Sequence, residues 1–126
     1  MIGKVILKEC YKEGFDEDEL YDAYKLFFGT LGSESRLKII NLLRNGKKNV
    51  SDIMSAFKMD QTAVSHDLAR LKMCGFVKVE IDGKYRYYKL NEETIKPLMD
   101  MIDKHMSLYC IHILRKIKGE KNEINE

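Results

Sequence analysis

Apolar residues between positions 60 and 90 change from a helical spacing to a strand-like one. Val64, Leu68 and Leu71 lie four and three residues apart, so they would share one buried face of a helix. Asp60 stands where a helix N-cap is expected, because its side-chain oxygen can accept from the free N–H groups of the first turn. Gly75 would end this helix.

The next residues alternate as a β-hairpin does. Asp82-Gly83 is the strongest two-residue hairpin signal and predicts a returning strand over residues 84–90. In that strand Lys84, Arg86 and Tyr88 would face one side. The strand before the turn carries the apolar side chains of Phe76, Val77, Val79 and Ile81.

Helical spacing also marks three earlier segments. The first covers residues 16–31, with acidic residues crowding its N-terminal turn, where the helix dipole favours them. The second runs from Ser33, its N-cap, to about Arg44. The third begins at Ser51 or a near neighbour and ends near Lys58. Only a three-residue turn separates it from the helix after Asp60, so the two must cross steeply, as in a helix-turn-helix.

The two ends of the chain are patterned differently. Residues 1–15 are weakly patterned and fit either a short extended piece or the start of a helix. After the hairpin, Asn91 predicts the cap of a last helix, although Pro97 favours a separate turn before a long helix from Pro97 to about Lys118. Its apolar stripe is wide: Ile95, Leu98, Ile102, Met106, Tyr109, Ile113 and Ile117.

Such a stripe either packs against the chain's own first helix or forms a dimer seam, and we favour a seam built from residues 16–31 and 97–118. The expected fold is α+β and mostly α, a winged helix-turn-helix with one β-hairpin wing and a long terminal dimerisation helix. We expect one domain in four parts. These are an N-terminal arm and first dimerisation helix (1–32), a DNA-binding core (33–91), a C-terminal dimerisation helix (92–118) and a flexible tail (119–126).

Composition changes this picture chiefly through charge. The net charge is only +2, but residues 33–90 carry twelve Lys and Arg against six Asp and Glu. An ordinary solvated surface would explain this, yet its concentration on the hairpin segment favours a polyanionic partner. The absence of a signal-peptide pattern or a long apolar run favours a cytoplasmic protein without a membrane partner. Three widely spaced cysteines do not suggest a disulfide framework.

Residue chemistry favours DNA binding over catalysis. The sequence has no glycine-rich phosphate loop, nucleophile elbow or HExxH motif, so we expect no enzyme. The donor-bearing side chains that would face away from the buried stripe, together with two basic residues of the hairpin, are the candidate contacts to double-stranded DNA: Gln61, Thr62, Ser65, His66, Arg70, Lys84 and Arg86. The alternative is a winged-helix module that binds a protein or RNA without sequence-specific DNA binding.

Three blocks of sequence carry a family resemblance: LFFGTLGSESRLKIINLL, NVSDIMSAFKMDQTAVSHDLARLKMCGFV and GKYRYYKLN. Over about residues 24–91 they resemble the ArsR/SmtB winged-helix repressors. The resemblance implies a homodimeric transcriptional repressor on an inverted-repeat operator, often released by a metal ion or another inducer. It assigns Gln61, Thr62, Ser65 and His66 to base edges or phosphates, and Lys84 and Arg86 to the DNA backbone.

The usual metal sites of that family are incomplete here. Asn49 and Ser51 occupy the positions of its Cys-x-Cys site. In its second site Asp103-x-His105 matches, but Lys116 and Gly119 stand where the later ligands would be. No metal site is therefore expected by the usual motifs, and the fold requires no cofactor.

Other soft or redox-active groups remain near the expected seam. Cys110, with His105 and His112 close in sequence and Cys10 in the N-terminal arm, is the candidate for a metal or thiol-based inducer site. The alternative is that Cys110 is only a small core residue of the seam. The inducer itself is not identified by the sequence.

Overall fold

The computed structural model of the chain describes residues 2–125, with side chains through Gly119. The chain divides into two compact units, residues 1–90 and 91–126. The first contains α1 (Lys4–Lys12), α2 (Glu17–Leu31), α3 (Glu34–Leu43), α4 (Val50–Phe57), α5 (Gln61–Met73), β1 (Val77–Asp82) and β2 (Tyr85–Leu90). The second contains α6 (Ile95–Leu108) and α7 (Cys110–Asn125).

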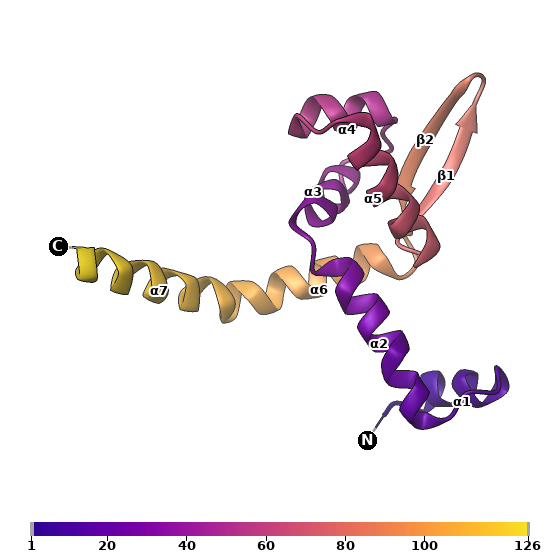
Figure 1. Cartoon of the computed structure of the whole chain (residues 1–126), viewed down its shortest axis with the longest axis horizontal. Coiled ribbons are helices and arrows are strands. Elements are labelled where there is room, and N and C mark those ends of the chain that lie inside the picture. Colours follow the sequence, from indigo (N-terminus) through magenta and orange to yellow (C-terminus); the bar gives the residue numbers. More distant parts are fainter. Residues whose placement is uncertain (1, 126) are drawn as a thin grey trace. The chain divides into compact units, whose positions relative to one another are not determined.

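In the first unit, α3, α4, α5 and the hairpin gather around one end of α2, and α1 lies at its other end (Figure 1). The helices α3, α4 and α5 and the base of the hairpin bury a shared apolar core. Its members are Ile39, Ile40, Leu43, Ile53, Val64, Leu68, Leu71, Phe76, Val77 and Leu90. The ring of Phe27 from α2 stacks on Phe76, with 5.2 Å between centroids, so α2 also joins the start of the hairpin.

Side-chain caps fix where the helices begin. Asp16 and Glu19 form a capping box at the start of α2, and Ser33 accepts from Arg36 N at the start of α3. The start of the next helix, predicted at Ser51 or a near neighbour, lies at Val50, one residue before Ser51. Asn49 caps α4, accepting from Asp52 N at 2.8 Å, so the helix begins at Val50.

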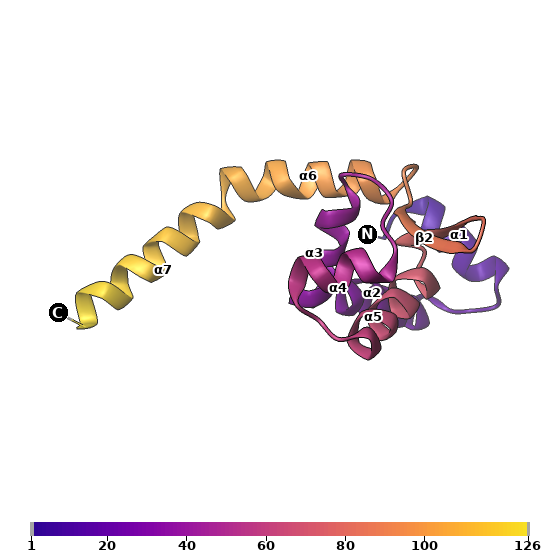
Figure 2. The ribbon, with the colours of Figure 1, turned by 90° about the horizontal axis from the view of Figure 1, so that it is seen from above.

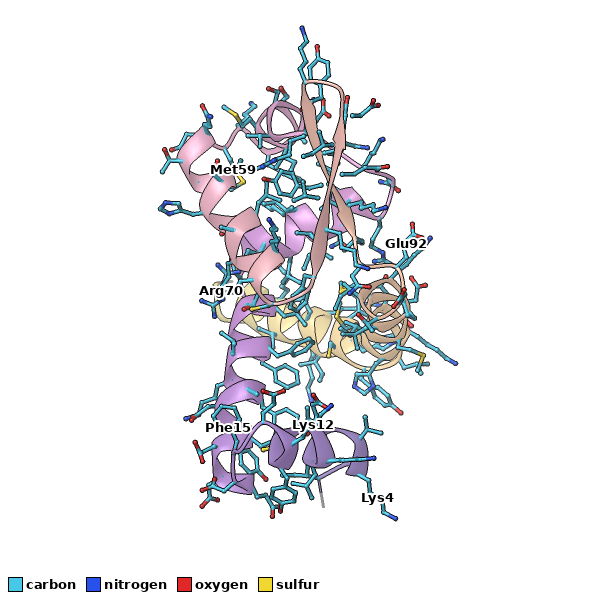
Figure 3. All side chains as sticks on the ribbon, turned by 90° about the vertical axis from the view of Figure 1, so that its right-hand side faces the viewer. Lys4, Lys12, Phe15, Met59, Arg70 and Glu92 are labelled. Carbon is cyan, nitrogen blue, oxygen red and sulfur yellow. The ribbon has the colours of Figure 1, made fainter. Side chains whose placement is uncertain are left out.

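The weakly patterned N-terminal segment is helical, which selects one of the two expected conformations. α1 ends where Phe15 N bonds to Cys10 O at 3.0 Å, and the chain then turns into α2. Figure 3 shows Lys4 and Lys12 marking the two ends of α1 and Phe15 on the connection. Cys10 is the buried residue of α1, and Leu20 is buried on α2.

The hairpin is antiparallel, pairing Val77 with Leu90 at its base and Asp82 with Tyr85 at its tip. The two turn residues are therefore Gly83 and Lys84, one position later than the predicted Asp82-Gly83 pair. Gly83 has φ +62°, whereas Lys84 is not among the positive-φ residues. That combination is typical of a type II′ turn, which needs glycine at its first central position. The returning strand begins at Tyr85 rather than Lys84.

The loop between α3 and α4 is also tied to the hairpin. Lys48 N donates to Tyr88 O at 3.0 Å, and Tyr88 N donates to Lys48 O at 2.8 Å. This isolated antiparallel bridge places a third stretch of chain beside β2. A single bridging residue has no alternating pattern, so the sequence does not predict this bridge.

The second unit corrects the prediction of one long helix over 97–118. α6 begins at Ile95, and Pro97 lies in its first turn, where a missing N–H breaks no helical bond. A separate turn at residues 92–94 precedes it, as predicted. Tyr109, with φ −129° and ψ −70°, interrupts the helix before α7. Figure 2 shows the change of direction between α6 and α7.

The structure describes only part of the expected tail, residues 119–126. α7 continues to Asn125, whereas Glu126 and the side chains from residue 120 on lie outside the described residues. Within residues 2–125, none of the helices has both the length and the apolar character needed to cross a membrane.

Candidate nucleic-acid interface

The exposed face of α5 is formed by the candidate DNA-reading residues. Val64, Leu68 and Leu71 are at most 1% exposed, which confirms the predicted buried stripe. Gln61, Thr62, Ser65 and His66 are exposed on the other side. Each carries a hydrogen-bonding group, so the face can offer donors or acceptors to base edges or phosphates.

The ends of α5 are set by local chemistry. Asp60 accepts from Ala63 N at 2.7 Å, the predicted N-cap. Lys58 ends α4 with φ 53°, a left-handed conformation that makes the short turn into α5 possible. At the other end Gly75 has φ +78°, and Phe76 N bonds to Leu71 O at 2.8 Å, which directs the chain into the hairpin.

Arg70 stands apart from the other candidates of this helix. It is half-buried, and its Nε donates to Thr30 Oγ1 of α2 at 2.8 Å. Figure 3 shows Arg70 near the junction of α5 and α2, at the opposite end of α5 from Met59. The structure thus gives the Arg70 side chain an internal partner, and its contact with DNA stays a prediction.

Asp67 is the acidic residue within this otherwise donor-rich helix. It faces α3: its Oδ1 lies 3.3 Å from Arg36 Nη1, and its Oδ2 accepts from Ser35 Oγ at 2.6 Å. Its side chain is 13% exposed. Its negative charge is therefore paired within the protein and turned away from Gln61 and Ser65.

The wing places basic groups at its tip and along its edge. Lys84 lies in the turn, with its Nζ 5.5 Å from the ring centroid of Tyr85, and Arg86 pairs across the hairpin with Ile81. Both are exposed, as phosphate contacts would require. Lys47, which sequence reasoning did not select, lies 3.4 Å from Glu80 Oε2 and 4.8 Å from the centroid of Tyr87.

The candidate inducer residues are Cys10 in the first unit and His105, Cys110 and His112 in the second. Cys10 is 7% exposed and donates to Asp16 O at 3.2 Å. Burial raises the pKa of its thiol, and the carboxylates at the start of α2 raise it further. Cys110 is exposed at the first position of α7, and the ring centroids of His105 and Tyr109 lie 4.9 Å apart. Across the described side chains, no three His, Cys, Asp or Glu groups converge as metal ligands would.

A short turn joining two helices, a donor-bearing second helix and a basic hairpin after it define a winged helix-turn-helix transcriptional regulator. Residues 33–79 match the family model described as "Bacterial regulatory protein, arsR family". An uncharacterized HTH-type transcriptional regulator of Methanocaldococcus jannaschii is 31% identical over 86 residues, which is 68% of this chain and 97% of that protein. The chain belongs to the ArsR family of transcriptional regulators, which are not enzymes.

Two further comparisons bear on the same elements. The arsenical resistance operon repressor of Bacillus subtilis is 31% identical over 84 residues, covering 66% of this chain and 80% of that protein. A solution NMR structure of a homodimeric winged helix-turn-helix DNA-binding domain comes from Mycobacterium bovis, and its source is described as a possible ArsR-family transcriptional regulator. It matches with a TM-score of 0.68 at 27% identity, covering 74% of this chain and 86% of that one. The predicted fold class and family are thereby confirmed.

Proposed function

We propose that this chain is a sequence-specific regulator, and more specifically a repressor, that binds double-stranded DNA as a homodimer. The observation that carries this is the exposed face of α5. Gln61, Thr62, Ser65 and His66 are all free of core packing while the same helix is anchored on its other side. A helix so presented fits the major groove, where base edges carry a distinct pattern of donors and acceptors.

In this proposal some residues contact base edges and read the sequence, and others contact phosphates and position the protein on the DNA. Gln61 hydrogen-bonds an adenine edge, Ser65 and Thr62 contact bases or phosphates, and His66 lies on the same face. Lys84 and Arg86 of the wing contact phosphates, which fix register without reading sequence. Arg70 contributes to the phosphate contacts through the part of its guanidinium that is not bonded to Thr30. In this proposal the protein acts in the cytoplasm.

The proposed dimer uses the apolar faces of α2, α6 and α7. Large apolar side chains are more than a third exposed on α2, including Phe28 at 61% and Tyr21 at 52%. An apolar hollow of about 370 Å³ lies between α1 and α2. Along α6, α7 and the break between them, the exposed apolar residues are Met101, Met106, Leu108, Tyr109, Ile111, Ile113, Leu114 and Ile117. Exposed apolar surface on this scale favours an isologous interface with a second copy.

The homodimeric state of the Mycobacterium bovis neighbour supports this assembly. A two-fold dimer presents its two recognition helices to an inverted repeat, with half-sites about one helical turn apart. Within the dimer, residues 1–32 and 92–118 supply the assembly surface, and residues 33–91 bind DNA.

Selection from a random-duplex pool with the purified protein gives the operator on which the proposal is tested. Gln61→Ala should lose about 1–3 kcal/mol on that operator and little on random duplex, because a base contact is lost. Arg86→Ala, the matched control from the wing, should weaken both about equally and flatten the salt dependence, because a phosphate contact is lost. Fluorescence anisotropy at two salt concentrations measures both.

Two outcomes contradict the proposal. Equal losses on operator and random DNA for Gln61→Ala would remove its reading role. Failure of the parent protein to bind any duplex at low salt would instead favour a protein-interaction or RNA-binding module.

For regulation we propose that Cys110 carries the inducer response, through metal binding or disulfide formation with a second thiol. Its thiol is exposed beside the Tyr109 break, so a reaction there acts where the helix direction changes. His105, His112 or Cys10 would supply further ligands, from either copy in the dimer. Cys110→Ser should abolish any change in operator affinity caused by zinc or oxidant, a change of about 1–3 kcal/mol in the parent. An unchanged response in the variant would reduce Cys110 to a surface residue.

A further inference from the structure

Thr30 is a buried polar residue within the last turn of α2. Its side chain is 0% exposed, and its Oγ1 donates to Leu26 O at 2.7 Å. The same oxygen accepts from Arg70 Nε at 2.8 Å and lies 3.2 Å from Cys74 Sγ. Because the hydroxyl proton is committed to Leu26, the thiol of Cys74 is the donor in that last contact. α2 is thereby bonded to two residues of the C-terminal turn of α5.

Arg36, in the first turn of α3, provides a second connection between α2 and α5. Its Nε donates to Thr30 O at 2.7 Å and its Nη2 to Gly29 O at 3.1 Å. Carbonyls in the last turn of a helix have no partner within the helix, and the negative end of the helix dipole lies there. A guanidinium is therefore well suited to cap α2. Its remaining donor, Nη1, reaches Asp67 Oδ1 of α5 at 3.3 Å.

These bonds hold the recognition helix from the side that faces away from the proposed DNA. Asp67 and Arg70 are one turn apart on α5, and both lead to the last turn of α2. Arg36 and Asp67 are only 21% and 13% exposed, so their interaction is less screened than a surface ion pair. Two tethers one turn apart fix the rotation of α5 about its axis as well as its height above α2.

We propose that Arg36 and Asp67 are positioning residues for DNA recognition: they clamp α5 to the end of α2 and so set the placement of the recognition helix. This inference rests on the proposed function. In the proposed homodimer α2 belongs to the assembly surface, so the clamp also relates the recognition helix of one protomer to that of its partner. The spacing between half-sites that the dimer accepts is then determined partly by this pair.

Asp67→Ala is the decisive variant, because it removes the tether of α5 at Asp67 while leaving Arg36 bonded to Gly29 and Thr30 and Arg70 bonded to Thr30. Binding is measured at a temperature where circular dichroism shows the variant folded. We expect about tenfold weaker binding to the selected operator. Random duplex should bind equally or more tightly, because a negative charge has been removed. On operators with one base pair inserted or deleted between half-sites, the parent should show a sharp optimum and the variant a flattened one.

A matched control comes from the same helix α3. Lys38 pairs with Glu34 at 3.3 Å, and both are largely exposed, so Lys38→Met removes an exposed ion pair within α3 itself. It should keep the parent's spacing optimum. Arg36→Met serves as the second variant and should reproduce the flattened profile, with a lower melting temperature because α2 loses its cap.

The outcomes separate this inference from the proposed function. If the parent fails to select a duplex, the proposed function is wrong. If the parent and Gln61→Ala behave as proposed but folded Asp67→Ala keeps the parent's operator affinity and spacing profile, the clamp is merely structural and the inference is overturned.

Discussion

At the scale of single residues, the buried thiol of Cys10 should make the stability of the protein depend on pH. Burial raises its thiol pKa, so the folded state holds this proton more tightly than the unfolded chain does. The stabilisation is complete below the ordinary thiol pKa, about 8.5, and is lost as pH rises through the raised pKa of the folded state.

We therefore expect the urea midpoint of the parent to fall more steeply than that of Cys10→Ala as the pH rises above the ordinary thiol pKa of about 8.5. Tyrosine and lysine titrations affect both proteins alike, so the difference between them isolates the thiol. A difference between the two midpoints that stays constant across this range would contradict the assignment.

Residues whose role depends on near neighbours in the sequence were predictable, and those with distant partners were not. The buried face of α5 and its exposed donors follow from helical periodicity alone. Arg36 bonds to Asp67, 31 residues away, and Arg70 bonds to Thr30, 40 residues away. Nothing in local spacing indicates such pairs. The acidic Asp67 within a donor-rich helix was the one available signal of an internal cation.

At the scale of elements, replacing glycine with alanine should have opposite effects on stability in α2 and in the hairpin turn. Gly83 has φ +62°, so Gly83→Ala should destabilise the fold by roughly 1–2 kcal/mol. Gly29 is inside α2 with open space where a Cβ would be, so Gly29→Ala should stabilise it by about 0.5–1 kcal/mol. Urea unfolding of both variants at pH 7 checks the pair. Changes of equal sign would mean that the turn or the helix is assigned wrongly.

Elements were predicted well in kind and less well in their limits. Asn49 and Ser51 are both cap-forming residues, so sequence alone could not choose the start of α4. Asp82-Gly83 and Gly83-Lys84 share the glycine that the turn requires, and only strand pairing decides between them. The break at Tyr109 carries neither glycine nor proline, which explains why one continuous helix was expected.

At the scale of the whole molecule, the proposed dimer predicts the effect of a charge on α7. Ile113 is 56% exposed, so Ile113→Glu should leave the single chain folded but weaken self-association. Sedimentation equilibrium at tens of micromolar should show a monomer, and operator affinity should fall with it. Arg115→Glu, exposed about 200° around the same helix, is the control and should stay dimeric. A dimer in both variants would place the seam elsewhere.

The bridge between Lys48 and Tyr88 divides the wing into two mechanical parts. The N–H and C=O groups of Lys48 both bond to Tyr88. The loop that leads into α4 therefore lies along one edge of the hairpin at Tyr88, on the side toward the hairpin's base. Among the described residues, the backbone of the outer part, from Tyr85 to Tyr87, pairs with β1 alone. We therefore expect bending to be concentrated in the tip that carries Lys84 and Arg86. In the proposed complex with DNA, this would let the tip follow grooves of different width without disturbing the helices. Amide hydrogen exchange should show slow exchange at Tyr88 and Lys48 and fast exchange at the tip.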